Sequence, residues 1–218
     1  MIIVNIWKIK CDLEKYDSLL EDPKFHEIVR IARIMNSLRY VLQEFAESEV
    51  SETPSYHRYR INTLFFTGAL LFEAKETLNN SGRYVHDLDA FPKITRIFRS
   101  QEFRLIEPYI FIMRNKLTFH FDPEVAAAAL KLLELPEIVF AEGMGTGTRH
   151  LHFVLADHLS LHYLFMSQNR DISEEEIGKI MQSILIIGSN LIAAGEEVVV
   201  EALYKLGWQL VDYPSTAV

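Results

Sequence analysis

PKFHEIVRIARIMNSLRYVLQEFAE, residues Pro23 to Glu47, is the stretch that most clearly sets the fold class. Its apolar side chains recur every three or four residues, which is the spacing of one face of an α-helix. That face consists of Ile28, Ala32, Met35, Leu38, Leu42 and Phe45. The stretch therefore predicts a long amphipathic helix whose apolar face packs against the rest of the protein.

The same periodicity recurs along most of the chain. A second helix is predicted from Tyr59 to about Leu78, where the segment Asn79–Gly82 would end it. The last helix is predicted to begin at Ser173, because Ser173 and Glu176 form a capping-box pattern. It would continue to about Leu210. Further helices are predicted over residues 91–99, 101–119, 123–135 and 155–168, and Pro108 would either kink the second of these or restart it.

One region departs from the helical pattern. The apolar runs EIVFAE and RHLHFV flank the glycine-rich segment Gly143–Thr148, which predicts a β-hairpin or a mobile loop. The segment is not a P-loop, because no Gly-Lys-Ser/Thr follows it. Since no repeat, low-complexity tract or linker is evident, we predict one all-α domain over residues 1–218, with an irregular insertion at about 137–152.

Composition limits the function classes. The chain has 218 residues, of which 49% are apolar, and its single cysteine, Cys11, excludes an intrachain disulfide and a multi-cysteine zinc site. The net charge of −8 argues against broad nonspecific nucleic-acid binding, which depends on neutralising phosphates. The start of the chain resembles no cleaved leader, and the apolar run Ile184–Gly195 is shorter than the roughly 18–20 residues of a membrane span. We expect a cytoplasmic protein without a membrane contact.

A local basic stretch stands out against the acidic background. The segment Pro92–Arg104 carries four cations against one acid, Glu102. These cations are candidate RNA contacts, and the alternative is an ordinary solvated helix face. They are Lys93, Arg96, Arg99 and Arg104.

A cluster of histidines supplies an alternative chemistry. His158 and His162 are four residues apart and would share a helix face, which is the spacing of a two-histidine metal site. His150 and His152 would share one side of an extended run, and Asp157 lies nearby in sequence. No H-E-x-x-H pattern is present, so ordinary polar or interface histidines remain the other interpretation. The dipeptide His86-Asp87 resembles the metal-binding dipeptide of HD-type phosphohydrolases, but no matching further ligands can be assigned.

The segment RNKLTFHFDP, Arg114 to Pro123, places polar residues within an apolar chain. Asp122 and Pro123 are typical of a new helix start, as N-cap and first helical residue. The preceding helix, whose buried stripe is predicted as Ile106, Ile110, Met113 and Leu117, would therefore end near His120. A histidine in a last helical turn is favoured in its protonated form by the helix dipole, and a nearby arginine is suited to bidentate phosphate contact.

Arg114-Asn115 followed by His120 resembles the motif of the HEPN superfamily, in which an arginine, a short spacer that commonly begins with a polar residue, and a histidine lie near a helix end. RNKLTFHFD is similar to the R-N-K-x-x-x-H-x-D form of some HEPN branches, including abortive-infection relatives. The motif covers a short stretch, and the helical pattern extends the resemblance to about half of the chain. The resemblance implies an up-and-down helical bundle that often dimerises.

The resemblance also implies a function. Many HEPN proteins are metal-independent RNases of toxin–antitoxin, phage-defence or RNA-processing systems. His120 would act as acid–base in attack by the 2′-hydroxyl on the phosphodiester, Arg114 would stabilise the phosphate charge, and Asn115 would orient the phosphate or the histidine. Glu73, on an earlier helix, is the candidate assisting acid, and Asp122 is the acidic end of the motif.

The expectation is thus a homodimeric, metal-independent endoribonuclease that needs no cofactor, acts on RNA and is paired with an antitoxin protein. Two alternatives stay open at this point. One is a noncatalytic helical dimerisation or interaction module, in which the motif residues are packed or ion-paired. The other is a metallohydrolase that uses the cluster His150–His162.

Overall fold

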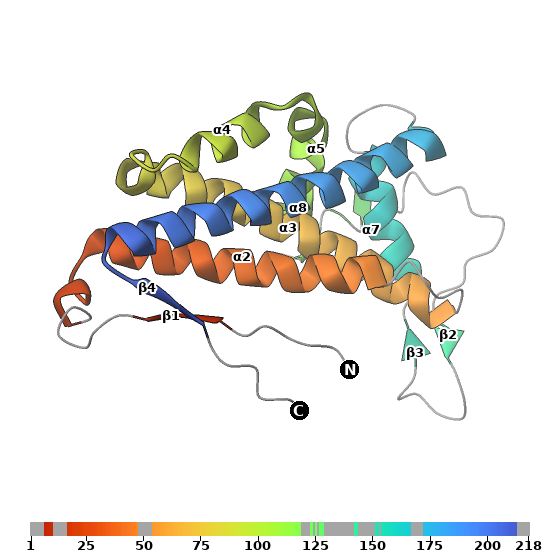
Figure 1. Cartoon of the computed structure of the whole chain (residues 1–218). Coiled ribbons are helices and arrows are strands. Elements are labelled where there is room, and N and C mark those ends of the chain that lie inside the picture. The colour runs from red at the N-terminus through yellow and green to blue at the C-terminus, as the bar shows by residue number, and fades with distance from the viewer. Residues whose placement is uncertain are drawn as a thin grey trace.

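The protein is described by a computed structural model over residues 7–10, 17–47, 54–118, 123, 125, 127–128, 142–143, 151–152, 154–166 and 172–212 (Figure 1). This part of the chain is mostly helical, which confirms the predicted all-α class. Its helices are α2 (Pro23–Glu47), α3 (Pro54–Val85), α4 (Phe91–Arg99), α5 (Gln101–Ile112), α7 (Val154–Met166) and α8 (Glu174–Lys205), and a π-helical turn, η2 (Met113–Thr118), follows α5.

Three long helices, α2, α3 and α8, form the body of the molecule, with α2 packed against both of the others (Figure 1). The start of α2 lies beside the end of α3, where Ser81 donates a hydrogen bond of 2.5 Å to Glu27, so these two helices are antiparallel. The start of α2 also lies beside the end of α8, because Phe25 stacks on Trp208 with ring centroids 6.0 Å apart. Helices α4 and α5 pack on the other side of α8.

The core follows the predicted stripe of α2 with one change. Ile28, Met35, Leu38, Leu42 and Phe45 are buried as predicted, and Ile31 takes the place that the sequence assigned to Ala32. Ala32 is only half-buried and borders a groove of about 690 Å³ between α2 and α8. Residues 31 and 32 are neighbours on the helix, so the periodicity alone did not separate the larger side chain from the smaller one.

Helix α3 is longer than predicted at both ends. It runs from Pro54 to Val85 and continues through Asn79–Gly82, which the sequence marked as its end. The prediction of that end was wrong because tertiary contacts outweigh the local preference of these residues. Leu78, Ser81 and Val85 are fully buried on one face, and the Ser81 hydroxyl is bound to Glu27 of α2.

Helix α8 begins as predicted and ends earlier. The Ser173 hydroxyl accepts a hydrogen bond from the Glu176 N–H, and the Glu176 carboxylate accepts one from the Ser173 N–H, so the predicted capping box is confirmed. The helix stops at Lys205 rather than near Leu210, because Gly207 takes a φ of 86° and reverses the chain.

The residues after α8 form a strand that the sequence did not predict. Strand β4 (Gln209–Asp212) pairs antiparallel with β1 (Trp7–Lys10), with Lys10 opposite Gln209 (Figure 1). A second small pairing joins β2 (Glu142–Gly143) to β3 (Leu151–His152), on either side of the glycine-rich segment. Residues 144–150 lie outside the described residues, so the conformation of that segment, and the extent of the insertion, stay predictions.

Helix α8 is also apolar enough, by length and composition, to cross a membrane over Glu175–Lys205. In this fold, however, its apolar side chains form part of the core, because one face of the helix is buried against α2, α4 and α5. The buried face consists of Ile180, Ile184, Ile187, Leu191, Ala194, Val198 and Ala202. This is the composition expected of a central core helix.

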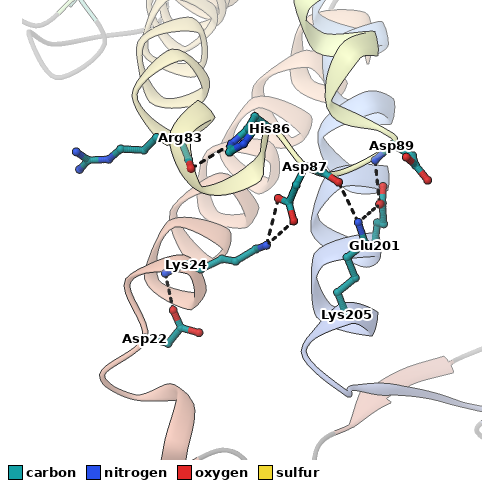
Figure 2. A network of polar contacts seen from close by, with 8 residues as sticks. All are labelled: Asp22, Lys24, Arg83, His86, Asp87, Asp89, Glu201 and Lys205. Atoms are coloured by element: carbon teal, nitrogen blue, oxygen red, sulfur yellow. Dashed lines mark hydrogen bonds and ion pairs between the residues drawn. The ribbon is translucent and has the colours of Figure 1, made fainter.

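A polar network closes one end of the bundle (Figure 2). The Glu201 carboxylate of α8 accepts two hydrogen bonds of 2.9 Å, from the backbone N–H groups of Asp89 and Ala90. Lys205 donates to the Asp87 carbonyl and pairs with Glu201, while Lys24 of α2 pairs with the Asp87 carboxylate at 3.2 Å. The turn between α3 and α4 is thereby tied to both α2 and α8.

The same network accounts for the dipeptide His86-Asp87. A ring nitrogen of His86 lies 3.2 Å from the Arg83 carbonyl at the end of α3, while the Asp87 carboxylate is occupied by Lys24. Neither side chain belongs to a metal site among the described residues, where no group of three or more His, Cys, Asp and Glu side chains is placed to hold a metal ion. The dipeptide serves the turn between α3 and α4.

The network predicts how stability responds to acid. The hydrogen bond from Lys24 lowers the pKa of Asp87. Burial raises the pKa of Glu201, but the N–H groups of Asp89 and Ala90 and the Lys205 ammonium more than offset it, so that the pKa lies below its usual 4.5. A carboxyl group whose pKa is lowered by folding stabilises the protein at pH values above its unfolded-state pKa. This stabilisation is lost as the pH falls through its folded-state pKa. We therefore expect the free energy of unfolding to decrease as the pH falls below about 4.5.

The Glu201→Gln variant isolates this contribution. We expect it to be less stable than wild type at neutral pH and to lose less stability on acidification, because the charge that titrates is gone. Urea unfolding measured across the acidic range tests this, with Glu76→Gln on α3 as the matched control that follows the wild-type curve. An unchanged acid dependence in Glu201→Gln would show that this network does not set it.

Candidate functional site

The motif arginine lies on an unusual stretch of backbone. Helix α5 continues through Pro108 without ending, and after Ile112 the chain widens into the π-helical turn η2, which carries Arg114 and Asn115. The helix therefore does not restart at Pro108, and a change of helix type follows about one turn later. π-Helical turns are rare and are found frequently at functional sites.

The π-helical turn is fixed to α3 at both ends. At its start, Met113 is fully buried against Gly68, where a Cβ atom added to the glycine would lie 2.0 Å from the Met113 sulfur. At its end, the buried Thr118 hydroxyl donates a hydrogen bond of 3.1 Å to the Phe65 carbonyl. The predicted buried stripe of Ile106, Ile110, Met113 and Leu117 is confirmed. The backbone that carries Arg114 is thus held in place by packing.

Arg114 is paired with the acid that the sequence singled out on the earlier helix. The Arg114 Nε donates a hydrogen bond of 2.6 Å to the Glu73 Oε1 of α3. The two side chains are 32% and 35% exposed, so the pair lies at the surface rather than in the core. A pair with this exposure contributes at most about 1 kcal/mol to stability, and its stronger effect is to orient the guanidinium group.

Asn115 completes a small polar arrangement. The Arg114 Nη1 donates a hydrogen bond of 2.7 Å to the Asn115 Oδ1, and the Asn115 amide nitrogen donates one of 3.0 Å to the Phe111 carbonyl. The guanidinium plane is therefore held from two sides, by Glu73 through Nε and by Asn115 through Nη1. The fold thus brings Glu73, which is distant in sequence, together with the neighbours Arg114 and Asn115.

The remaining motif residues, His120 and Asp122, lie outside the described residues. Their predicted roles, as acid–base and as helix N-cap, stay predictions. The described chain reaches Thr118 at the end of η2 and includes Pro123 as helical.

The basic residues proposed for RNA contact lie at a distance from Arg114. Arg104 is ten residues earlier on the same helical segment, or roughly 15 Å along its axis. Arg96, Arg99 and Arg104 are exposed, whereas Lys93 is ion-paired with Glu197 of α8. Arg104 lines a groove of about 600 Å³ between α5 and α8, together with Lys179. Lys93 and Arg104 thus face α8, whereas Arg114 is bound to Glu73 of α3.

The histidine cluster is only partly described. His162 lies on α7, with its Nε2 buried and, among the described atoms, without a hydrogen-bond partner. His150 and the side chains of His152 and His158 lie outside what the structure describes. Within the described residues, no group of three or more His, Cys, Asp and Glu side chains is placed to hold a metal.

Three features of the site were not predicted from the sequence. They are the π-helical backbone, the close approach of Gly68 to Met113, and the exposed ring of Phe111 beside Arg114. The close approach could have been suspected from Gly68 itself, because a glycine inside an apolar helical stretch is unfavourable unless packing requires it.

Comparison with protein-family models, with curated proteins and with solved structures finds no match. The function of the site is therefore argued from the arrangement of Glu73, Arg114 and Asn115 and from the motif that contains them.

Proposed function

We propose that the protein is a HEPN-like, metal-independent endoribonuclease that works as a homodimer in a toxin–antitoxin or phage-defence system. The proposal includes an up-and-down helical bundle, a cytoplasmic location without a membrane contact, and an antitoxin protein as partner. The substrate is single-stranded RNA, and the reacting groups are contributed by Arg114, Asn115 and His120.

One observation supports this proposal above the others. Glu73 and Asn115 hold the Arg114 guanidinium at the surface in a fixed orientation, on a packed π-helical turn. An arginine fixed in this way is preorganised to bind a phosphate, because little further side-chain entropy is lost when the ligand binds. The motif places a histidine two residues beyond the end of the same turn in sequence.

The proposed chemistry is transesterification within RNA. His120 takes the proton of the 2′-hydroxyl, the 2′-oxygen attacks the adjacent phosphorus, and the bond from phosphorus to the 5′-oxygen breaks. The protonated His120 gives its proton to the leaving 5′-oxygen, and the products carry a 2′,3′-cyclic phosphate and a 5′-hydroxyl. Arg114 stabilises the charge that builds up on the phosphate oxygens.

Cleavage of single-stranded RNA by purified protein in EDTA tests the proposal. We expect cleavage at the same rate with and without the chelator, 2′,3′-cyclic phosphate ends on the products, and no cleavage of the same sequence as DNA, which lacks the 2′-hydroxyl. Cleavage that stops in EDTA and returns with a divalent metal would instead favour the metallohydrolase that uses the cluster His150–His162.

Glu73 provides a prediction about the orientation of Arg114. We expect the Glu73→Gln variant to keep its stability within about 1 kcal/mol, because the pair is exposed, and to lose roughly tenfold in the cleavage rate constant. Urea unfolding and single-turnover cleavage measure the two effects separately. The control is Glu107→Gln on α5, whose carboxylate pairs with Lys75 and not with Arg114.

A noncatalytic interaction module is the second candidate, because the same ion pair also fits it. Such a module keeps Arg114 engaged with Glu73 to hold α3 against η2, and neither groove described above is lined by Arg114. It predicts a folded dimer that binds no RNA and cuts none. The cleavage assay in EDTA therefore separates the two candidates directly.

A further inference from the structure

Phe111 stands out on α5 as a large apolar side chain left at the surface. Its side chain is 51% exposed, although Ile110 and Ile112 on either side are buried. The residues one turn before and after it on the same face are Glu107, Pro108, Arg114 and Asn115. Along its own helical segment the ring is therefore flanked by polar residues and a proline, and about half of its surface is exposed.

The orientation of the Phe111 ring is fixed by a second aromatic ring. Phe72 of α3 meets it edge to face, with centroids 5.7 Å apart and an interplanar angle of 69°. Phe72 directly precedes Glu73, so α3 and the segment of α5 and η2 are joined by two adjacent contacts, one aromatic and one ionic. The Asn115 amide is also bound to the Phe111 carbonyl.

The aromatic ring and the guanidinium group therefore both meet α3, at its adjacent residues Phe72 and Glu73. Phe111 and Arg114 are three residues apart in sequence, on the two sides of the junction between α5 and η2. A planar apolar surface beside a cation matches the two parts of a nucleotide, because bases of single strands stack on aromatic rings while arginine binds phosphate. Stacking needs no particular base, since every base has a flat face.

We propose that Phe111 is the platform on which a base of single-stranded RNA stacks next to the phosphate bound at Arg114. This inference rests on the proposed function, and it names the part of the substrate that the site reads. It assigns Phe111 a binding role and Phe72 a positioning role, in which the edge of its ring holds the Phe111 ring in place.

A second copy of the chain is the other occupant to consider. Phe66 of α3 is 45% exposed and lies six residues before the half-buried Phe72, or about 9 Å along the helix axis. The exposed rings of Phe66 and Phe111 thus lie on different helices, and the charged pair of Glu73 and Arg114 adjoins the contact of Phe72 with Phe111. This mixture of rings and charges favours a nucleotide over an apolar dimer contact.

The test compares binding of two short single-stranded RNAs, one intact and one with a single abasic position, each with a 2′-deoxy sugar at the cut site to block cleavage. The abasic position is moved along the strand in a series. Wild type, Phe111→Leu, Phe111→Trp and the control Tyr40→Leu are measured at one low salt concentration in EDTA. Tyr40 is 64% exposed on α2 and plays no part in the site.

We expect Phe111→Leu to bind the intact RNA about tenfold more weakly, within a range of roughly 5- to 100-fold, and Phe111→Trp to restore binding. At one abasic position the difference between wild type and Phe111→Leu should disappear. Tyr40→Leu should behave as wild type. Phe72→Leu should show a smaller loss than Phe111→Leu.

Three results would overturn the inference. The first is an equal loss for Phe111→Leu on intact and on every abasic RNA, which would show that the ring acts through packing. The second is unchanged RNA binding together with a weaker dimer in sedimentation, which would make a second copy the occupant. The third is no RNA binding by wild type. Because binding is measured separately from cleavage, the two proposals can fail independently. Base-dependent binding without cleavage would refute only the proposed nuclease activity. Cleavage that does not depend on Phe111 would refute only its proposed role in stacking a base.

Discussion

RNA cleavage by the Arg114→Ala variant is expected to be at least about 100-fold slower than by wild type, because a preorganised cation at the phosphate is removed. His120→Ala is expected to lose between about 100-fold and 10,000-fold, since it removes the acid–base group. The two effects should not multiply in the double variant, because the residues act on the same transition state. Single-turnover cleavage of a labelled RNA in EDTA measures all three rates.

Matched variants separate the chemistry from general effects of charge. Arg33→Ala removes an exposed arginine from α2 and is expected to leave the rate unchanged. Arg114→Lys keeps the positive charge but loses the planar guanidinium that Glu73 and Asn115 hold, so we expect it to recover only a small part of the activity. Equal rates for wild type, Arg114→Ala and His120→Ala would refute the catalytic assignment.

A large loss of stability is expected from substitution of either of two glycines of α8. A Cβ atom at Gly188 would lie 2.6 Å from the Leu42 Cδ1, and one at Gly195 would lie 2.4 Å from the Met35 sulfur. Leu42 and Met35 are buried core residues of α2, so both side chains must shift to admit the added atoms. We expect Gly188→Val and Gly195→Val each to lower the free energy of unfolding by about 3 kcal/mol, at the upper end of the usual cost of overpacking.

Thermal unfolding measures this loss, and each variant is expected to melt about 6–12 °C below wild type. Gly178 gives the control on the same helix, because a Cβ atom there would meet nothing within 4 Å. Valine and glycine differ by only a few tenths of a kcal/mol in helix propensity, so Gly178→Val should change stability by less than about 0.5 kcal/mol. A destabilisation of Gly178→Val as large as that of Gly195→Val would contradict the close packing of α2 and α8.

The glycines also show how close packing and the site are related. Gly68 does for α3 and η2 what Gly188 and Gly195 do for α8 and α2, since each lets a partner side chain approach the helix backbone. At Gly68 the partner is Met113, the residue directly before Arg114. The position of Arg114 thus depends on a buried glycine of α3.

The sequence was sufficient to predict those features that depend only on contacts between residues a few positions apart. The stripe of α2 between Ile28 and Phe45 required only the period of a helix, and Ser173 with Glu176 capped α8 through contacts between residues three apart. The order Arg114-Asn115 also placed two site residues next to each other, because neighbours in sequence on a helix remain close in space. These features follow from backbone geometry that every helix shares.

Only the tertiary structure decided the rest. Local preference would have ended α3 at Asn79–Gly82, but the buried Ser81 and its bond to Glu27 keep it helical. The strand pair β1–β4 joins residues near the two ends of the described chain, and no local pattern reports such a pairing. The sequence by itself determined the helical class and the motif, because both depend on short spacings. The pairing of Glu73 with Arg114 and the π-helical turn beneath it were decided by how α3 packs against η2, since contacts between distant segments are set by the whole core at once.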